Sequence, residues 1–119
     1  MLLELIIDPA LIKHHYGSIP ETYDAPARAY ERFSADYSAE DYKNAFDRDF
    51  VEPVNALCNS LIDRGDIDYL NANQCKQLIP WLEERLKRRN PYPLGEFYEK
   101  LLEYSRRAVA LGTGVVLDL

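Results

Sequence analysis

The clearest periodic pattern in the sequence lies between Pro93 and Gly112. Apolar residues recur there at helical intervals, so they share one side of a helix, while charged residues occupy the other side. Pro93 suits the first position of a helix, and Gly112 suits the left-handed residue that ends one. The apolar side is wider than a contact between two helices requires. The pattern therefore predicts a helix over residues 93–111 that forms a wall of the core, with Leu101 near the centre of its buried face.

Capping residues and apolar spacing predict further helices. Asn71, with Gln74 three residues later, forms a capping box ahead of a stripe of apolar residues at helical spacing. A proline inside a helix removes a backbone hydrogen bond, so we expect Pro80 to bend or split this helix and Pro53 to mark a break in an earlier one. The predicted helices lie near residues 10–16, 25–34, 39–50, 53–64, 72–89 and 93–111.

Both ends of the chain carry a short apolar run that is typical of a β-strand. These runs cover residues 2–7 and 115–119. Because a lone apolar strand is prone to aggregate, we expect the two runs to pair with each other over the helices. The pair would leave two free edges for a second copy of the chain or another protein. The predicted fold class is mainly α: a compact bundle of five or six helices in one domain, residues 1–119, with a small β element formed by the N- and C-terminal strands.

The composition suits a soluble protein of the cytoplasm. Hydrophobic residues make up 47% of the 119 residues and charged residues 29%, which is enough for both a core and a solvated surface. No apolar run is long enough to span a membrane, and the N-terminus lacks the basic residues of a secretory signal. Cys58 and Cys75 belong to no CxxC motif, so we expect two reduced core thiols, with a disulfide between them as the alternative.

The sequence carries no motif of a catalytic or cofactor site. It lacks the glycine-rich loops that bind phosphates and the GxSxG nucleophile motif. His14 and His15 are adjacent, whereas two histidines that bind one metal ion on a helix are four residues apart. We therefore expect no catalytic residue, no cofactor and no metal. An enzyme would need a pocket in which acidic residues meet His14 or His15.

Two features of the predicted helix 72–89 each allow two interpretations. Trp81 lies off the apolar stripe, so it either packs in a second interface or is exposed at a binding site. The cluster Lys87, Arg88 and Arg89 is favourable at the C-terminal end of a helix. A contact with phosphate or RNA is the alternative, but three charges in an acidic chain do not establish one. The sequence therefore does not favour a nucleic-acid ligand.

The formal net charge of −6 is concentrated in the first half of the chain. Residues 31–52 carry seven acids and three bases and form the most acidic segment. An acidic surface with aromatic centres favours a basic partner. The predicted partner-binding residues are Asp36, Tyr37, Glu40, Asp41, Tyr42, Asp47 and Asp49.

The leading hypothesis is a cytoplasmic, non-catalytic protein-binding domain that recognises a basic partner. An immunity or inhibitor protein for a bacterial toxin is one concrete form, because such a protein covers a basic active site by mimicking phosphate charge. In the simplest alternative, the acids of this segment are only a solvated face. A different function, a homodimeric structural or regulatory module, is suggested by the free strand edges and the many tyrosines. No membrane partner is expected.

Overall fold

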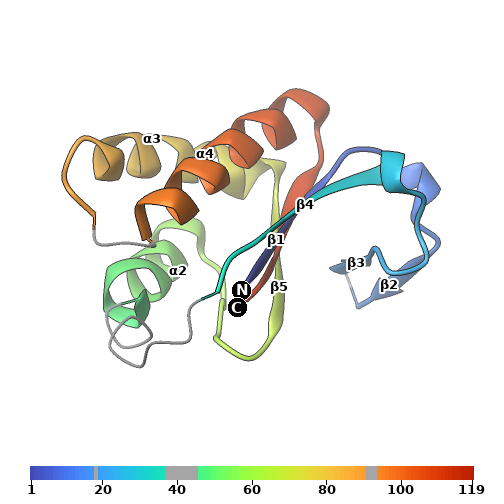
Figure 1. The fold of residues 1–119 in the computed structure, drawn as a ribbon, viewed down its shortest axis with the longest axis horizontal. Coiled ribbons are helices and arrows are strands. Elements are labelled where there is room, and N and C mark those ends of the chain that lie inside the picture. Colours follow the sequence, from blue (N-terminus) through green and yellow to red (C-terminus); the bar gives the residue numbers. More distant parts are fainter. Residues whose placement is uncertain (18, 37–45, 91–93) are drawn as a thin grey trace.

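A computed structural model describes residues 1–17, 19–36, 46–90 and 94–119, and its ribbon is drawn in Figure 1. The centre is a four-stranded antiparallel sheet in the order β4-β1-β6-β5. Its strands are β1 (Leu2–Ile6), β4 (Tyr30–Ser34), β5 (Ile67–Asn71) and β6 (Gly114–Asp118). A separate hairpin consists of β2 (His14–Tyr16) and β3 (Ile19–Glu21). The helices are α2 (Glu52–Cys58), α3 (Ala72–Leu86) and α4 (Leu94–Leu111), with short turns η1 (Pro9–Leu11) and η2 (Ala27–Ala29) and a π-helical turn η3 (Asp47–Val51).

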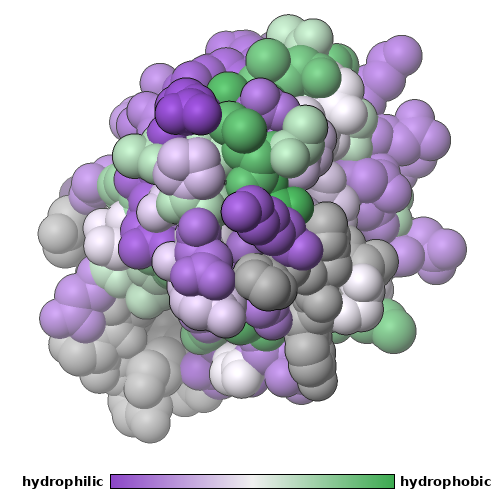
Figure 2. Space-filling view, turned by 90° about the vertical axis from the view of Figure 1, so that its right-hand side faces the viewer, coloured by the Kyte–Doolittle hydropathy of each residue, from purple (hydrophilic) through white to green (hydrophobic). Residues whose placement is uncertain are grey.

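The two faces of the sheet are covered by different elements. Leu3 and Leu5 of β1 belong to the main core, which the helices complete. Ile6 of β1 and Val116 of β6 belong to a smaller core on the other face. Figure 1 accordingly shows α3 and α4 on one side of the sheet and the hairpin on the other. Figure 2 views the molecule from the hairpin side, where hydrophobic residues form a band between hydrophilic ones.

The prediction of a mainly α bundle with five or six helices is wrong. Residues predicted as a helix over 10–16 form η1 and β2, and those predicted over 25–34 form η2 and β4. The apolar pattern in both stretches is too short to separate helix from strand, and pairing with β1 decides the outcome for β4. The terminal strands do pair with each other, as expected. Their outer edges are not free, however, because β4 and β5 extend the sheet on both sides.

The helices predicted over 72–89 and 93–111 are found as α3 and α4. The helix predicted over 53–64 ends early, at Cys58, and most of the one predicted over 39–50 lies outside the described residues. Asn71 and Gln74 form the predicted capping box at the start of α3, with both hydrogen bonds at 2.9 Å. Gly112 follows α4 with a φ of 69°, in the left-handed region. Pro80 does not split α3, which continues from Ala72 to Leu86. Pro53 lies in the first turn of α2, directly after the π-helical η3, so the helical geometry does change at the predicted break.

Both cysteines are free and buried. Burial raises the pKa of the Cys75 thiol from 9.0 to about 12, and it also raises the pKa of the Cys58 thiol. The thiolate is the form that reacts with disulfide reagents. We therefore expect both thiols to react slowly with Ellman's reagent at about pH 8 in the native protein, and rapidly once guanidinium unfolds it. Prompt native labelling of either cysteine would contradict this; Ser34→Cys, at an exposed position, is the positive control.

The raised pKa of the Cys75 thiol also affects the stability of the protein at alkaline pH. An unfolded Cys75 loses its proton near 9.0, whereas the folded one keeps it until about 12. The unfolded state therefore binds fewer protons in this range, and the contribution of Cys75 to stability is lost as the pH rises between these values. Cys75→Ala should weaken this alkaline loss of stability in urea titrations.

Candidate functional site

The structure describes three of the seven predicted partner-binding residues. Asp36 is exposed. Asp47 accepts two hydrogen bonds from the guanidinium of Arg64, at 2.6 and 2.7 Å. Asp49 forms an ion pair with Arg85. Two of these three acids are therefore paired with arginines of the same molecule. The other four predicted residues lie outside the described residues: Tyr37, Glu40, Asp41 and Tyr42.

Asp49 joins three helical elements at one point. Its carboxylate extends from η3, pairs with Arg85 in the last turn of α3 through one oxygen, and accepts a hydrogen bond at 2.5 Å from the Tyr98 hydroxyl of α4 through the other. With both carboxylate oxygens engaged, Asp49 is not available as a free general base. Its role in this arrangement is to fix the position of the Arg85 guanidinium.

Aromatic rings hold Arg85 from its other side. The guanidinium carbon lies 5.6 Å from the centre of the Trp81 ring and 6.0 Å from that of Tyr98, within the range of cation–π attraction. Trp81 is half-buried and packs edge-on against Tyr98 with ring centres 5.8 Å apart, so the interpretation as a packed residue is confirmed. The Nε of Arg85 is buried and has no hydrogen-bond partner among the described residues. Arg85 is thus held in place by Asp49 and two aromatic rings, and its Nε still has a hydrogen to donate.

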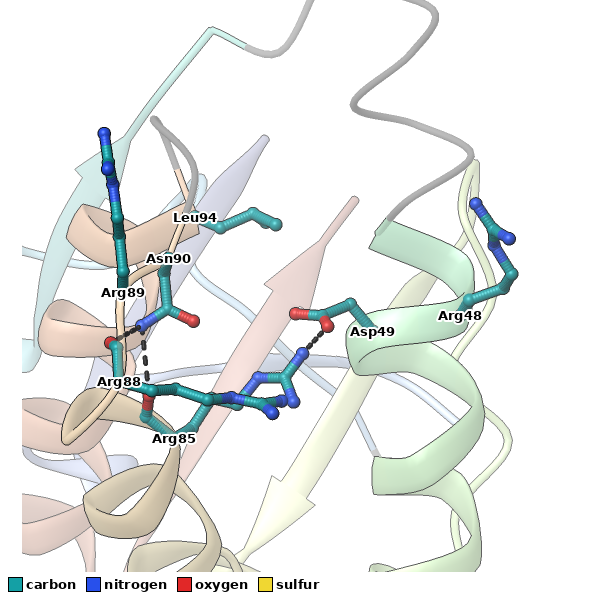
Figure 3. A pocket seen from close by; sticks show the side chains of 7 residues that line it. All are labelled: Arg48, Asp49, Arg85, Arg88, Arg89, Asn90 and Leu94. Carbon is teal, nitrogen blue, oxygen red and sulfur yellow. Dashed lines mark hydrogen bonds and ion pairs between the residues drawn. The ribbon is translucent and has the colours of Figure 1, made fainter.

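A cavity of about 430 Å³ opens beside this ion pair, and we call it the arginine pocket. Figure 3 shows Arg85 facing Asp49 across the pocket, with Arg89 on the α3 side and Arg48 on the η3 side. The pocket is lined by Arg48, Asp49, Arg85, Arg88, Arg89, Asn90 and Leu94. Four arginines and one aspartate give this lining a formal charge of +3.

The chain reversal after α3 places two of these arginines at the pocket. The side-chain amide of Asn90 donates hydrogen bonds to the carbonyls of Arg85 and Arg88, both at 3.0 Å. These bonds satisfy carbonyls that the end of a helix would otherwise leave without partners. A smaller adjoining cavity of about 320 Å³ shares Arg85 and Arg88 and adds Lys87, which pairs with Glu84 of the same lining. The basic surface therefore continues around the end of α3.

The pocket has the chemistry of an anion-binding site. Guanidinium groups are always charged at neutral pH, and their forked donors match phosphate and carboxylate oxygens in pairs. The sequence showed Arg88 and Arg89 as a basic cluster, but nothing in it linked them to Arg48 or Asp49, which are about 40 residues away in the chain. Only the packing of η3 against the end of α3 brings these residues together.

Comparisons with known proteins give no match, whether to a family model, to a curated protein or to a solved structure. In the described ranges, no three histidine, cysteine or acidic side chains gather as metal ligands would. No helix in those ranges has both the length and the apolar character needed to cross a membrane. The function is therefore inferred from the arginine pocket.

Proposed function

We propose that the chain is a non-catalytic binding domain that recognises an oxyanion, with a phosphate ester as the preferred class, in the arginine pocket. The observation that carries this proposal is the gathering of Arg48, Arg88 and Arg89 around one cavity of an acidic protein. Among the described residues, no carboxylate pairs with any of the three. Other arginines do have acidic partners: Arg64 pairs with Asp47, and Arg107 with Glu31.

An anion in the pocket would relieve an unfavourable arrangement of charge. Like charges around one cavity repel each other, and a phosphate dianion offers oxygen acceptors to them; Arg48 and Arg89, which Figure 3 shows extending away from the Arg85–Asp49 pair, would turn inward to reach it. The net charge of −6 does not prevent this, because charges beyond a Debye length of about 8 Å are largely screened at physiological salt. Arg85, held by Asp49 and two aromatic rings, provides a preorganised donor at the base of the pocket.

Fluorescence of Trp81 provides a direct test, since it is the only tryptophan and its ring lies against Arg85. We expect inorganic phosphate and O-phosphoserine to change the emission saturably, with a Kd of about 1 mM or tighter. Sodium chloride at matched ionic strength should not do so. Acetate and glutamate test whether a carboxylate serves equally well. If O-phosphoserine binds no more tightly than acetate and glutamate, the preferred ligand class is a carboxylate and not a phosphate ester.

The matched pair of variants is Arg88→Ala/Arg89→Ala and Arg28→Ala/Lys76→Ala. Both remove two exposed positive charges, but only the first pair lies at the pocket. We expect the first double variant to weaken phosphate binding at least about tenfold. The second should leave it within about twofold, because it changes only the net charge. Equal weakening by both, or no saturable binding to the wild type, would refute the proposal.

Recognition of a basic protein partner, with an immunity protein as one form, stays a prediction. Of its seven predicted residues, Asp36 is exposed and forms no ion pair with the described residues, and four lie outside the described residues. The charge-reversed variant Asp41→Lys/Asp47→Lys tests it: a partner captured from the native cell by the wild type should be lost. The homodimer also stays a prediction, which light scattering over a tenfold range of concentration would test.

A further inference from the structure

A further cavity lies on the hairpin face of the sheet. Its volume is about 420 Å³, and because it extends between β3 and β5 we call it the β3–β5 cleft. Figure 1 shows the hairpin at the opposite end of the molecule from the C-terminal end of α3, so this cleft is separate from the arginine pocket. The cleft is lined by Glu4, Ile19, Pro20, Glu21, Thr22, Tyr23, Ile67 and Val116.

Glu4 places a buried carboxylate in the cleft. It belongs to the central strand β1 and is only 6% exposed. One of its oxygens, Oε2, accepts hydrogen bonds from the Thr22 hydroxyl at 2.6 Å and from the Arg32 guanidinium at 2.9 and 3.1 Å. Among the described residues, no donor reaches the other oxygen, Oε1. Oε1 is not among the fully buried side-chain atoms without a partner, so it keeps contact with solvent and is open to accept a hydrogen bond from a ligand.

The lining of the cleft combines apolar surface with acidic groups. Ile19, Val116 and Ile67 form apolar surface, although Ile67 is 50% exposed to solvent. Glu21 also lines the cleft, half-buried, and forms no ion pair with the side chains that the structure describes, which do not include those of residues 14–16. Since Arg32 already neutralises Glu4, Glu21 provides the uncompensated charge. A group that fits this lining has an aliphatic stem and a cationic head, as lysine and arginine side chains do.

Strand β5, which contributes Ile67 to the cleft, could hold a partner segment that carries such a side chain. β5 is the last strand of the sheet, so one of its edges has no hydrogen-bonded strand beside it in the described part of the chain. An extended segment that pairs with such an edge directs alternate side chains to the same face. A segment along β5 would therefore direct every second side chain toward the face on which Ile67 lines the cleft.

We infer that the β3–β5 cleft binds a lysine or arginine side chain carried by an extended basic segment of a protein partner. The aliphatic stem packs on Ile19 and Ile67, and the cationic head bonds to Glu21 and to Oε1 of Glu4. This places recognition of a basic partner at residues other than 36–49 and does not depend on the arginine pocket.

Peptides test the ligand class directly. The probes are the blocked tripeptide acetyl-Ala-Arg-Ala-amide, its lysine counterpart, and the same peptide with citrulline, which keeps the shape of arginine but is neutral. In ¹⁵N-resolved NMR titrations we expect the two cationic peptides to shift the amides of Ile19, Glu21 and Ile67 saturably. Citrulline should bind at least about fivefold more weakly. Equal binding of citrulline, or no saturable shift with any peptide, would overturn the inference.

Two matched variants separate the cleft from general electrostatics. Glu21→Gln should weaken binding of the arginine peptide about fivefold. Glu52→Gln removes the same charge at an exposed position of α2 outside the cleft, and it should leave binding unchanged. Neither substitution removes a buried hydrogen bond, so the thermal midpoint should stay within about 2 °C of the wild type. Equal weakening by both variants would mean that net charge alone attracts the peptide, and this would also overturn the inference.

The two sites should respond independently. Arg88→Ala/Arg89→Ala should bind the arginine peptide with wild-type affinity, and Glu21→Gln should bind phosphate with wild-type affinity. If phosphate binding fails while the peptide binds as expected, the proposed function is wrong and the cleft still stands. If the arginine peptide does not bind while phosphate binds as expected, the inference about the cleft is wrong and the proposed function still stands.

Discussion

Gly114→Ala should destabilise the protein by at least about 3 kcal/mol. A Cβ atom at this position would lie 2.3 Å from the carbonyl oxygen of Leu70 and 2.5 Å from both the Cζ atom and the hydroxyl oxygen of Tyr69. The Tyr69 ring can rotate, but the carbonyl belongs to the backbone of β5, which is paired with β6 along its whole length. Relief therefore requires the two strands to separate. Their separation would also disturb Asn71, which caps α3.

Gly95→Ala is the matched control for this substitution. Gly95 lies in the first turn of α4, and an added Cβ would find its nearest neighbour, Cβ of Asn90, at 3.9 Å. Alanine favours a helix over glycine, so Gly95→Ala should stabilise the protein by about 0.5–1 kcal/mol. Urea titrations of both variants at neutral pH give the two free energies of unfolding. A loss of less than about 1 kcal/mol for Gly114→Ala would mean that β5 and β6 adjust without separating.

Leu101→Ala should cost about 2–5 kcal/mol. Leu101 is fully buried near the middle of α4, within the main core that the sheet and helices share. Removing most of its side chain loses the transfer free energy of those atoms and leaves a cavity. The cavity cannot close easily, because residues of α3, α4 and the sheet all belong to this core.

The control is Glu99→Ala on the opposite, exposed side of α4. It removes no buried contact, so its effect should stay within about 0.5 kcal/mol. Denaturant midpoints of the Leu101→Ala and Glu99→Ala variants, measured side by side, give the two changes in stability. Similar small effects from both substitutions would show that α4 does not pack through the face that contains Leu101.

The sequence predicted α3 and α4 well because each is long and carries its own signals. The capping box at Asn71 and the terminal Gly112 act within a few residues, so their effect is visible without knowledge of the fold. β4 was missed for the opposite reason. Its five residues form a strand because they pair with β1, which is about 25 residues earlier in the chain. Such a partner has no signature in the local pattern.

The candidate site was predictable only in fragments. Arg88 and Arg89 were visible as a basic cluster at a helix end, with phosphate as an alternative partner. Asp49 was assigned to an acidic surface, whereas its charge is paired with Arg85. Charge counted along the chain does not show which opposite charges will meet, because pairing depends on how distant elements pack.

The central position of β1 and β6 determines the order in which the chain can fold. Leu2 lies opposite Asp118 in the register, so the middle of the sheet joins segments more than 100 residues apart. During synthesis, β1 emerges well before β6 and cannot gain this neighbour until β6 has left the ribosome. The hairpin, α3 and α4 can form earlier, because their contacts are more local. The sheet, and with it the cleft between β3 and β5, is therefore completed only after β6 has been synthesised.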